Sequence, residues 1–365
     1  MFAKLQHLGI RGLPLELIKD YFNNRYQFVV FRGTESIQRI IRVGVPQGSI
    51  LGPLFFLIYI NDLARVSLLF RSILFADDTN LFIKHRTREG LYRIANEELG
   101  KFSRWVSHNK LTLNHNKTEY IEFIKSKPFS PNQSLVIDGK DIKRVQESKF
   151  LGIIIDSRIS WRPHIQKIIT KISQTIGIIG RARVFMSQPQ LALLYNTMVL
   201  PHLQYCLINW GNFRTDSNCK LGKKLLTLQK CLVRIVNHAP GLSHADPLFY
   251  KQGSLKIEDL YEQSVRMFSY KLFKNALPQE IADIFPKNNH CHSTRSAKNN
   301  LFVNRSHPRS IKAIIPRCWN SLPPAMKLAP SLASFKSQSK ASLLAPYSSF
   351  VCQLSQCPSC SPNEP

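Results

Sequence analysis

Two adjacent carboxylates, Asp77 and Asp78, stand between two short apolar runs. An apolar run interrupted briefly by polar turn residues predicts a β-hairpin with its tip at the interruption. Neighbouring side chains of a straight strand point to opposite faces, whereas at a hairpin tip they can converge on one ligand. Such a pair suits Mg²⁺, a hard cation that prefers oxygen ligands. The alternative is an ordinary surface turn, because Asp favours turns in any case.

A second candidate is the loop 44–54, which is rich in Gly and Pro and carries Gln47 and Ser49. Gly lets a backbone approach a ligand closely, and the exposed N–H groups at a helix start favour phosphate. The apolar run 55–63 follows, so we predict that the loop opens a buried helix. A turn that only connects a strand to a helix is an equal alternative.

The overall composition points to a folded protein that binds polyanions. The chain has 365 residues, 44% of them hydrophobic and 20% charged, which allows more than one globular domain. Its 50 Lys and Arg against 23 Asp and Glu give a formal net charge of +27. This bias predicts attraction to nucleic acid first and to an acidic membrane surface second.

The sequence gives the membrane alternative little support. The longest apolar run, residues 50–60, is too short to span a bilayer, and the N-terminus lacks the apolar segment of a signal peptide. The eight Cys are scattered, which favours a reducing compartment over a disulfide framework. We therefore expect an intracellular protein, in the nucleus or the cytoplasm, that is not secreted.

Apolar periodicity and turn residues predict the elements that position these groups. Helices are expected over 1–25 with a break at 9–14, over about 88–109, over 161–240, over 242–285 and over 331–344. Strands are expected as a pair within 26–43, at 120–124, as a hairpin at 135–140 turning on Asp138-Gly139, and as one continuous apolar strand at 150–155, buried on both faces.

The segment from Ser157 to Pro240 is strongly basic, with Asp216 as its only acid against twelve Lys and Arg. Ile side chains at helical spacing form one stripe, and Lys167 and Lys171 lie one turn apart on another face. A charge run is usually a solvated face, but solvated faces normally mix signs. The one-sided charge favours a phosphate-binding module.

Several motifs, taken in their order and spacing, closely resemble the reverse transcriptases of non-LTR (LINE-type) retrotransposons. These motifs are Val45–Leu54, Tyr59–Leu63, Phe75–Thr79, Asn109–Asn114 with Lys117-Thr118, and Phe150–Asp156. The later part of the chain, with Tyr205 and Trp210 among its residues, is similar to the C-terminal regions of such elements. The jockey-like and chicken-repeat-like groups are the nearest, and the resemblance extends from Met1 to about Leu344.

The resemblance implies a chemistry and a set of roles. The chemistry is nucleotidyl transfer assisted by two Mg²⁺ ions, with Mn²⁺ as an alternative ion. It implies that an RNA template, a DNA primer and deoxynucleoside triphosphates are the partners, and we see no sign of a membrane or protein partner. The resemblance makes Asp77 and Asp78 catalytic metal ligands and Lys117 a catalytic general acid near the pyrophosphate. It places Pro46, Gln47 and Gly48 in the nucleotide pocket, and Leu151 and Gly152 in the primer grip. The residues implied to contact the nucleic-acid backbone are Lys167, Lys171, Arg181 and Arg183. For Lys117 the alternative is an ordinary surface lysine.

The implied fold class is α+β. Its first part is a polymerase palm, which is an antiparallel sheet with packed helices, and most of the fingers are missing. An all-α basic thumb and a mostly helical C-terminal region follow the palm. The expected boundaries are 1–125 for the truncated fingers and palm, 126–160 for the end of the palm, 161–240 for the thumb, 241–345 for the helical and basic C-terminal region, and 346–365 for a flexible tail.

The family's first catalytic motif carries a third Asp, which we expect shortly before the helix that begins near Phe2. Glu16 and Asp20 are the only acids before Arg25, and both lie in helical sequence, so neither is a substitute. We therefore expect this polypeptide alone to be inactive or nearly so. The alternative is a non-catalytic nucleic-acid-binding remnant that uses the basic thumb. A group II intron-type or telomerase-like polymerase ranks below both.

The C-terminal tail carries Cys352, Cys357 and Cys360. Structural zinc requires four ligands, and no His or further Cys lies nearby. We expect free thiols here, with a zinc site as the alternative.

Overall fold

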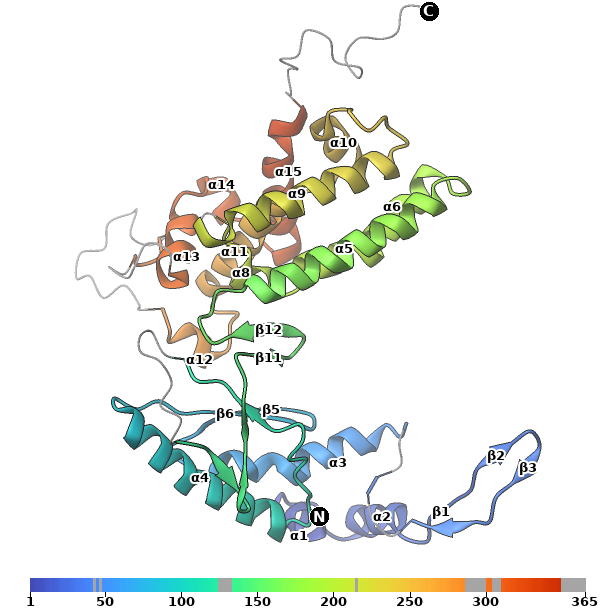
Figure 1. Ribbon diagram of the computed structural model, residues 1–365, viewed down its shortest axis with the longest axis vertical. Helices are drawn as coiled ribbons and strands as arrows, with labels where there is room; N and C mark the ends of the chain where they lie inside the picture. Colours follow the sequence, from blue (N-terminus) through green and yellow to red (C-terminus); the bar gives the residue numbers. More distant parts are fainter. Residues whose placement is uncertain are drawn as a thin grey trace, which may run out of the picture. The chain divides into compact units, whose positions relative to one another are not determined.

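The structure is a computed structural model that describes residues 1–41, 44–45, 48–123, 133–213, 216–285, 300–303 and 310–348. The chain divides into two compact units. Unit 1 comprises residues 1–120 and 126–145, and unit 2 comprises residues 121–125 and 146–365. Figure 1 shows the elements of both units. The mixture of helices and small sheets fits the predicted α+β class.

The helices of unit 1 lie mostly where the periodicity predicts them. They are α1 (Phe2–His7), α2 (Leu13–Phe22), α3 (Leu51–Ile60), the 3₁₀ helix η1 (Asn61–Arg65) and α4 (Arg88–His108). The break between α1 and α2 falls at Gly9 to Gly12, and both of these Gly have positive φ, which L side chains rarely adopt. Thr87 caps the start of α4, because its side chain accepts a hydrogen bond from the N–H of Gly90.

The strands of unit 1 are short and pair two by two. They are β1 (Tyr26–Gln27), β2 (Val30–Phe31), β3 (Thr34–Glu35), β4 (Arg39–Ile40), β5 (Arg71–Phe75), β6 (Asp78–Phe82), β7 (Glu119–Tyr120), β8 (Val136–Ile137), β9 (Lys140–Asp141) and β10 (Lys143–Arg144). Antiparallel pairs are β1–β4, β2–β3, β5–β6 and β8–β9, whereas β7 and β10 are parallel. Within the described residues these pairs do not join into the single antiparallel sheet that we predicted.

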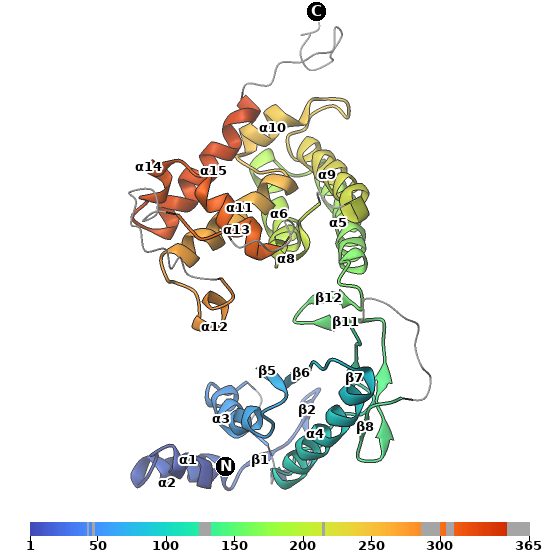
Figure 2. The same ribbon diagram turned by 90° about the vertical axis from the view of Figure 1, so that its left-hand side faces the viewer.

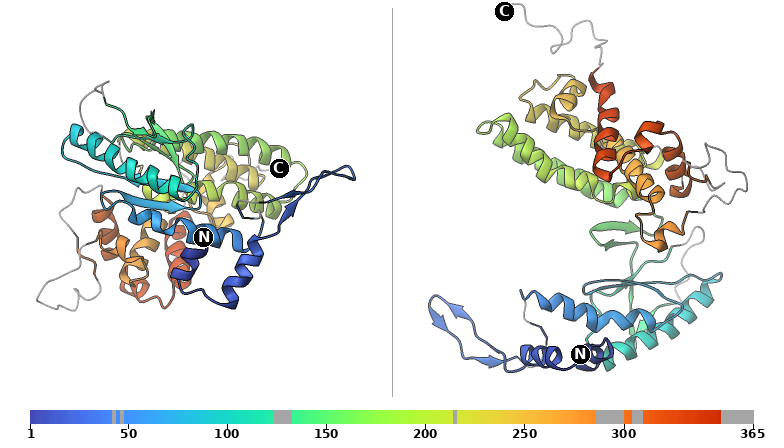
Figure 3. Two further views of the ribbon diagram at one scale, coloured as in Figure 1. Left: turned by 90° about the horizontal axis from the view of Figure 1, so that it is seen from below. Right: turned by 180° about the vertical axis from the view of Figure 1, so that it is seen from behind.

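Two predicted hairpins are confirmed in unit 1. Strands β2 and β3 turn through Arg32 and Gly33, and both views of Figure 3 show this hairpin projecting from the rest of the unit. Strands β8 and β9 turn through Asp138 and Gly139, whose φ values of 52° and 73° are those of a type I′ turn. The strand predicted at 120–124 is shorter, because β7 ends at Tyr120, and residue 124 lies outside those described.

The prediction that loop 44–54 opens a buried helix is wrong in one respect, because α3 is only partly buried. Phe55 packs on α2, with ring centroids 5.6 Å from Tyr21 and 5.0 Å from Phe22. Leu54 and Leu57 remain 51% exposed. A helix that is apolar around its whole circumference is normally enclosed. Here only one stripe of it finds partners among the described residues.

Unit 2 has more helices among the described residues than unit 1, and they carry most of the burial. They are α5 (Arg162–Ala182), α6 (Gln188–Met198), α7 (Leu200–Gln204), α8 (Leu207–Trp210), α9 (Asp216–Val236), α10 (Ala245–Gln252), α11 (Ile257–Phe273), α12 (Gln279–Ala282), α13 (Ile311–Asn320), α14 (Pro324–Lys327) and α15 (Leu332–Ser348). Figure 2 shows α5 beside α9, and the buried Ile stripe of α5 faces a core that also includes Leu225 and Leu232 of α9. The predicted helical character of this region is thus confirmed.

The prediction of one continuous strand at 150–155 is wrong. The segment is a hairpin of β11 (Glu147–Phe150) and β12 (Ile153–Asp156), in which Phe150 pairs with Ile153. Gly152 at φ 91° allows the chain to reverse inside the apolar run. Burial on both faces also fails, because Phe150, Ile154 and Ile155 are only half-buried.

The C-terminal helix extends further than expected. Helix α15 ends at Ser348, so it includes the first residues of the predicted tail 346–365. Residues 349–365, with Cys352, Cys357 and Cys360, lie outside those described. The five predicted domains stay a prediction. None of the described helices combines the length and apolar character needed to cross a lipid bilayer.

Candidate functional site

The two carboxylates lie at the tip of a hairpin, as predicted. Phe75 pairs with Asp78, so strands β5 and β6 are joined by the two residues Ala76 and Asp77. Ala76 has a φ of 49°, a left-handed conformation that few residues other than Gly adopt readily. Asp77 therefore lies in the turn itself, and Asp78 begins the returning strand.

The hairpin has one packed face and one open face. Paired residues share a face, so Asp78 lies on the same side as Phe75 and as Ile73 two residues further along β5. Those two apolar side chains are exposed. On the other face, Leu74 and Leu81 pack against Leu63, Phe102 and Val106, which fixes the hairpin on α4 and η1. The carboxylates are thus carried by a positioned hairpin whose outer face is uncovered.

The carboxylates of Asp77 and Asp78 are exposed, and neither forms a hydrogen bond or ion pair with another described residue. Within the described ranges no group of three or more His, Cys, Asp or Glu side chains is placed to hold a metal ion. Two carboxylates on one turn supply only a few of the oxygen ligands that hard divalent cations require. The described residues therefore do not by themselves form a two-ion centre.

The loop before α3 is described only in part, since Pro46 and Gln47 lie outside the described residues. Gly48 has a φ of 84°, and a methyl group added to it would meet no atom within 4 Å. The side chain of Ser49 accepts a hydrogen bond from the N–H of Gly52 at 3.1 Å, which helps the helix to begin. Gly48 thus offers an open backbone, as a ligand-binding loop requires.

A charged cluster holds α3 and η1 in place. The ammonium group of Lys4 donates to the carbonyl oxygen of Tyr59 at 2.6 Å and to Asp62 at 2.7 Å. The indole N–H of Trp105 donates to the same carboxylate at 3.2 Å. Partial burial pushes the pKa of Asp62 upward, but the hydrogen bonds from Lys4 and Trp105 outweigh it and hold the pKa below its ordinary value. The motif Tyr59–Leu63 is therefore tied to both α1 and α4.

Lys117 lies in a turn between α4 and β7 and is exposed. The backbone carbonyl of Asn114 accepts hydrogen bonds from the N–H groups of Lys117 and Thr118, both at 3.1 Å. Leu111 and Leu113, just before this turn, pack in the same cluster as Leu74 and Leu81 of the hairpin. The turn and the hairpin thus share a core, although no hydrogen bond or ion pair joins Lys117 to either carboxylate among the described residues.

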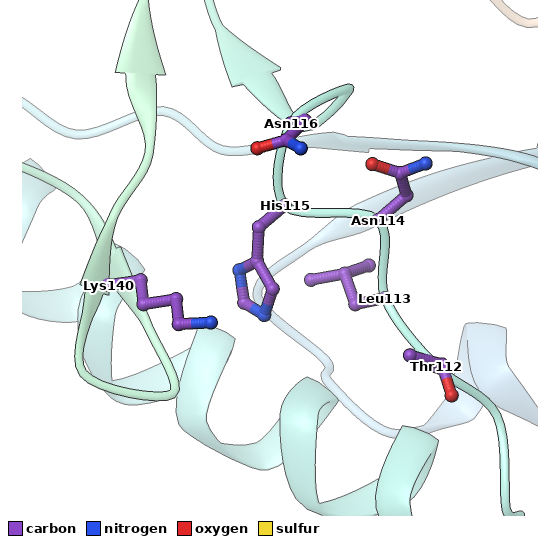
Figure 4. Close-up of a pocket in the computed structure, with 6 residues that line it drawn as sticks. All are labelled: Thr112, Leu113, Asn114, His115, Asn116 and Lys140. Carbon is purple, nitrogen blue, oxygen red and sulfur yellow. The ribbon is translucent and has the colours of Figure 1, made fainter.

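A shallow cavity of about 430 Å³ lies beside this turn. Figure 4 shows Lys140 reaching from the β8–β9 hairpin toward the loop that carries His115, Asn114 and Asn116. The imidazole Nε2 of His115 is 3.8 Å from Asp138, whose carboxylate also accepts a hydrogen bond from Ser103. These contacts fix the loop on α4.

In unit 2, Leu151 and Gly152 form the turn between β11 and β12. Their φ values are 45° and 91°, so both central residues are in the left-handed region. The hydroxyl of Tyr205 donates a hydrogen bond to the carbonyl oxygen of Leu151 at 2.6 Å. The resemblance implies that Leu151 and Gly152 form the primer grip. In the structure they form a tight turn that the hydroxyl of Tyr205 holds in place.

The four basic residues predicted to contact the nucleic-acid backbone do not all lie on the same face of α5. At 100° per residue, Lys167, Lys171 and Arg181 lie on one face of α5, and all three are exposed. None of the three forms an ion pair with another described residue. Arg183 follows the last helical residue, is half-buried, and lies on a different face.

Asp156 anchors the start of α5. Its carboxylate accepts hydrogen bonds from the N–H groups of Ser160 and Trp161, both at 2.9 Å. Partial burial pushes the pKa of Asp156 upward, but these N–H groups outweigh it and lower the pKa below its ordinary value. The side-chain amide of Asn218 on α9 donates to the carbonyl of Ser160 at 2.9 Å, so the basic face of α5 is fixed to the core.

The sequence patterns assign no separate role to Lys4, Asp62, Asp156 or Tyr205. Asp62 and Asp156 lay inside recognised motifs, and their polar side chains beside apolar runs were an available signal. The partners of Lys4 and Tyr205 lie 58 and 54 residues away in the sequence, and no local pattern reveals such pairs.

Comparison with known proteins agrees with these motifs. Residues 2–155 match the family model of the reverse transcriptase (RNA-dependent DNA polymerase). The chain is 28% identical over 240 residues to the RNA-directed DNA polymerase from the mobile element jockey of Drosophila funebris. This alignment covers 62% of this chain and 25% of the relative. It is 25% identical over 252 residues to the "Probable RNA-directed DNA polymerase from transposon X-element" of Drosophila melanogaster. This alignment covers 64% of this chain and 27% of the relative.

The chain thus spans about a quarter of the length of these relatives, 25–27%. The family match covers Asp77, Asp78, Lys117, Gly48 and the Leu151-Gly152 turn. Among the matched relatives are polymerases of the jockey, X-element and BS elements. Residues 2–155 accordingly match the reverse transcriptase family, and the chain is similar to the jockey-like polymerases of non-LTR retrotransposons.

Proposed function

We propose that this chain supplies the catalytic hairpin, the primer grip and the basic thumb of an RNA-directed DNA polymerase. The observation that carries the proposal is the exposed carboxylate pair Asp77-Asp78 at the tip of a packed hairpin, inside the segment 2–155 that matches the family. Its substrates would be an RNA template, a DNA primer and deoxynucleoside triphosphates.

In this proposal the hairpin holds Asp77 and Asp78 where the reacting phosphates are bound. Two Mg²⁺ ions, when bound, would supply charge stabilisation for the displaced pyrophosphate. Pro46, Gln47 and Gly48 would line the nucleotide pocket, and the open backbone at Gly48 supports that role. Lys117, on an exposed turn that shares a core with the hairpin, would donate a proton to the leaving pyrophosphate.

The basic face of α5 would grip the backbone of the duplex. Lys167, Lys171 and Arg181 lie on one exposed face and have no acidic partner among the described residues, so their charge is available for phosphates. Such contacts hold a duplex without reading its sequence. Arg183, on a different face, would contribute less to the same grip.

The number of acidic side chains near the hairpin tip would limit the catalytic activity of the chain alone. The described residues bring no third acidic or imidazole group to Asp77 and Asp78. We therefore expect the chain to bind a primer–template and not to extend it unless a further carboxylate is supplied.

A non-catalytic nucleic-acid-binding protein is the second candidate. The unpaired basic face of α5 favours it, because phosphate binding requires no metal site. In that case Asp77 and Asp78 would have no effect on any reaction.

A chimera separates the two candidates. The segment of the jockey polymerase that precedes the matched region is fused before Met1, and DNA synthesis is measured on a primed RNA template with Mg²⁺. We expect synthesis by the chimera, and none by the chimera with Asp77→Ala or Asp78→Ala. The matched control is Asp20→Ala, an exposed acid on α2, which should leave synthesis unchanged.

The polymerase proposal fails if the chimera binds the primed template and Asp77→Ala does not reduce its synthesis. It also fails if the chimera folds and binds but makes no DNA.

A further inference from the structure

The turn between β11 and β12 adopts a conformation that its sequence does not favour. Leu151 and Gly152 are the two central residues, and both have positive φ. Two positive φ values define a type I′ turn, for which Asn, Asp and Gly are the usual residues. Leucine at such a position crowds its Cβ against the backbone. A contact from outside the turn would offset this steric cost.

Tyr205 contacts both residues of the turn. Its hydroxyl donates to the carbonyl oxygen of Leu151 at 2.6 Å. A methyl group added to Gly152 would lie 3.3 Å from the ring carbon Cε1 of Tyr205, closer than ordinary van der Waals contact. The ring therefore covers one side of the turn, and the hydroxyl fixes the direction of one peptide group.

Tyr205 is itself held firmly at the end of α7. Its backbone carbonyl accepts a hydrogen bond from the indole N–H of Trp210 at 2.9 Å, and Trp210 is fully buried. The side chain of Tyr205 is nevertheless 52% exposed, so burial does not explain its position. Its backbone is anchored in the core while its phenol reaches out to the turn.

The fixed peptide group has a free donor on its other side. A trans peptide is planar, so the carbonyl of Leu151 and the N–H of Gly152 point in opposite directions. With the carbonyl bound to Tyr205, the N–H points away from the tyrosine. No hydrogen bond from this N–H to another described residue is present. A backbone N–H held in this way suits a phosphate oxygen.

We propose that Tyr205 is a positioning residue, which orients the Leu151–Gly152 peptide so that the N–H of Gly152 binds a phosphate oxygen at the 3′ end of the primer. This inference rests on the proposed function, in which this turn contacts the primer. Tyr205 acts through the turn and itself touches no reacting atom.

The test compares two nucleic acids with the full chain and its Tyr205→Phe variant, which keeps the ring and removes only the hydroxyl. One nucleic acid is an RNA template with a recessed DNA primer, and the other is a blunt RNA–DNA duplex of equal length. We expect the variant to bind the recessed end about fivefold more weakly, the value of one hydrogen bond, and the blunt duplex as before.

The matched control is Tyr270→Phe in the same unit, whose hydroxyl donates to the carbonyl of Ala329 at 3.1 Å. This variant should bind both duplexes as the wild-type chain does. Equal weakening of both duplexes by Tyr205→Phe would indicate a general structural role and would overturn the inference. Unchanged binding of the recessed end would overturn it as well.

Amide hydrogen exchange supplies a readout that needs no nucleic acid. The N–H of Ile153 closes the turn opposite Phe150, so its exchange should be faster in Tyr205→Phe and unchanged in Tyr270→Phe. If the wild-type chain binds neither duplex, the proposed function fails at that step. Unchanged exchange at Ile153 overturns the positioning role independently.

Discussion

Unit 2 encloses large buried clusters of apolar side chains, whereas unit 1 leaves many of its apolar side chains exposed. In unit 2, large side chains such as Trp210, Trp319 and Phe335 are almost wholly buried. In unit 1, the outer face of the β5–β6 hairpin and the free side of α3 are open, as Phe75 and Leu57 illustrate. The carboxylates therefore lie in the unit that buries fewer of its apolar side chains. They are carried by a two-stranded hairpin, and such a hairpin is only marginally stable when isolated.

In the proposed function, this difference would correspond to separate tasks for the two units. Unit 2 has the core and the basic face that a self-supporting nucleic-acid grip requires. In the proposed function, unit 1 would present the carboxylates of a site that other residues complete. Four changes test this division, from the largest expected effect to the smallest.

Removing a core ring of unit 2 should have the largest effect. Phe335→Ala deletes a fully buried ring that lies 4.6 Å, centroid to centroid, from Tyr270, and should lower the free energy of unfolding by about 3–5 kcal/mol. Phe75→Ala on the open hairpin face should lower it by less than about 1 kcal/mol. Urea unfolding followed by circular dichroism measures both values. Equal losses would remove the contrast between the units.

Acidification should destabilise unit 2 through His164. This imidazole is buried against Trp210, and burial first, then the charge of Lys167, lowers its pKa to about 4. Because the unfolded chain binds a proton near pH 6.5 and the folded chain does not, stability falls as the pH drops from about 6.5 to about 4, by about 3 kcal/mol. His164→Gln should lack this fall, and the exposed His202→Gln should keep it. The measurement is urea unfolding across that pH range.

The basic face of α5 should contribute through counterion release. The double variant Lys167→Ala with Lys171→Ala should reduce the slope of log affinity against log salt by about 2, for any duplex sequence. The matched control is the pair Lys336 and Lys340, also exposed and one turn apart, on α15. A control pair that alters the slope as much would show that total charge matters and the face does not.

The open side of α3 should be the most tolerant. Leu57→Glu should change the free energy of unfolding by less than about 0.5 kcal/mol, and should reduce the binding of a hydrophobic dye. Phe55→Ala, on the packed side of the same helix, should cost several times more. A large loss from Leu57→Glu would mean that this side is packed in solution.

Local signals predicted much of this molecule correctly. Asp138-Gly139 predicted a hairpin turn, and the interruption at Asp77 predicted the hairpin tip, because both depend on a few adjacent residues. The Ile stripe of α5 predicted its buried side for the same reason.

Features that depend on distant partners were not predictable. The turn at Gly152 was hidden inside an apolar run, since a single Gly between Leu and Ile does not distinguish a strand from a tight hairpin. The exposure of α3 was missed because composition shows that a surface is apolar and does not show what covers it. The bond from Tyr205 to Leu151 spans 54 residues, so only the fold reveals it.

The central proposal is that the chain would grip a primer–template, and that the carboxylates of its described residues would not by themselves support extension. The most direct measurement follows a labelled DNA primer on an RNA template, with the full chain, Mg²⁺ and deoxynucleoside triphosphates present. We predict that the primer enters a complex at low salt, leaves it as the salt rises, and is not lengthened. A primer that stays free at low salt would contradict the claim, and so would one that is lengthened by the chain but not by its Asp77→Ala variant.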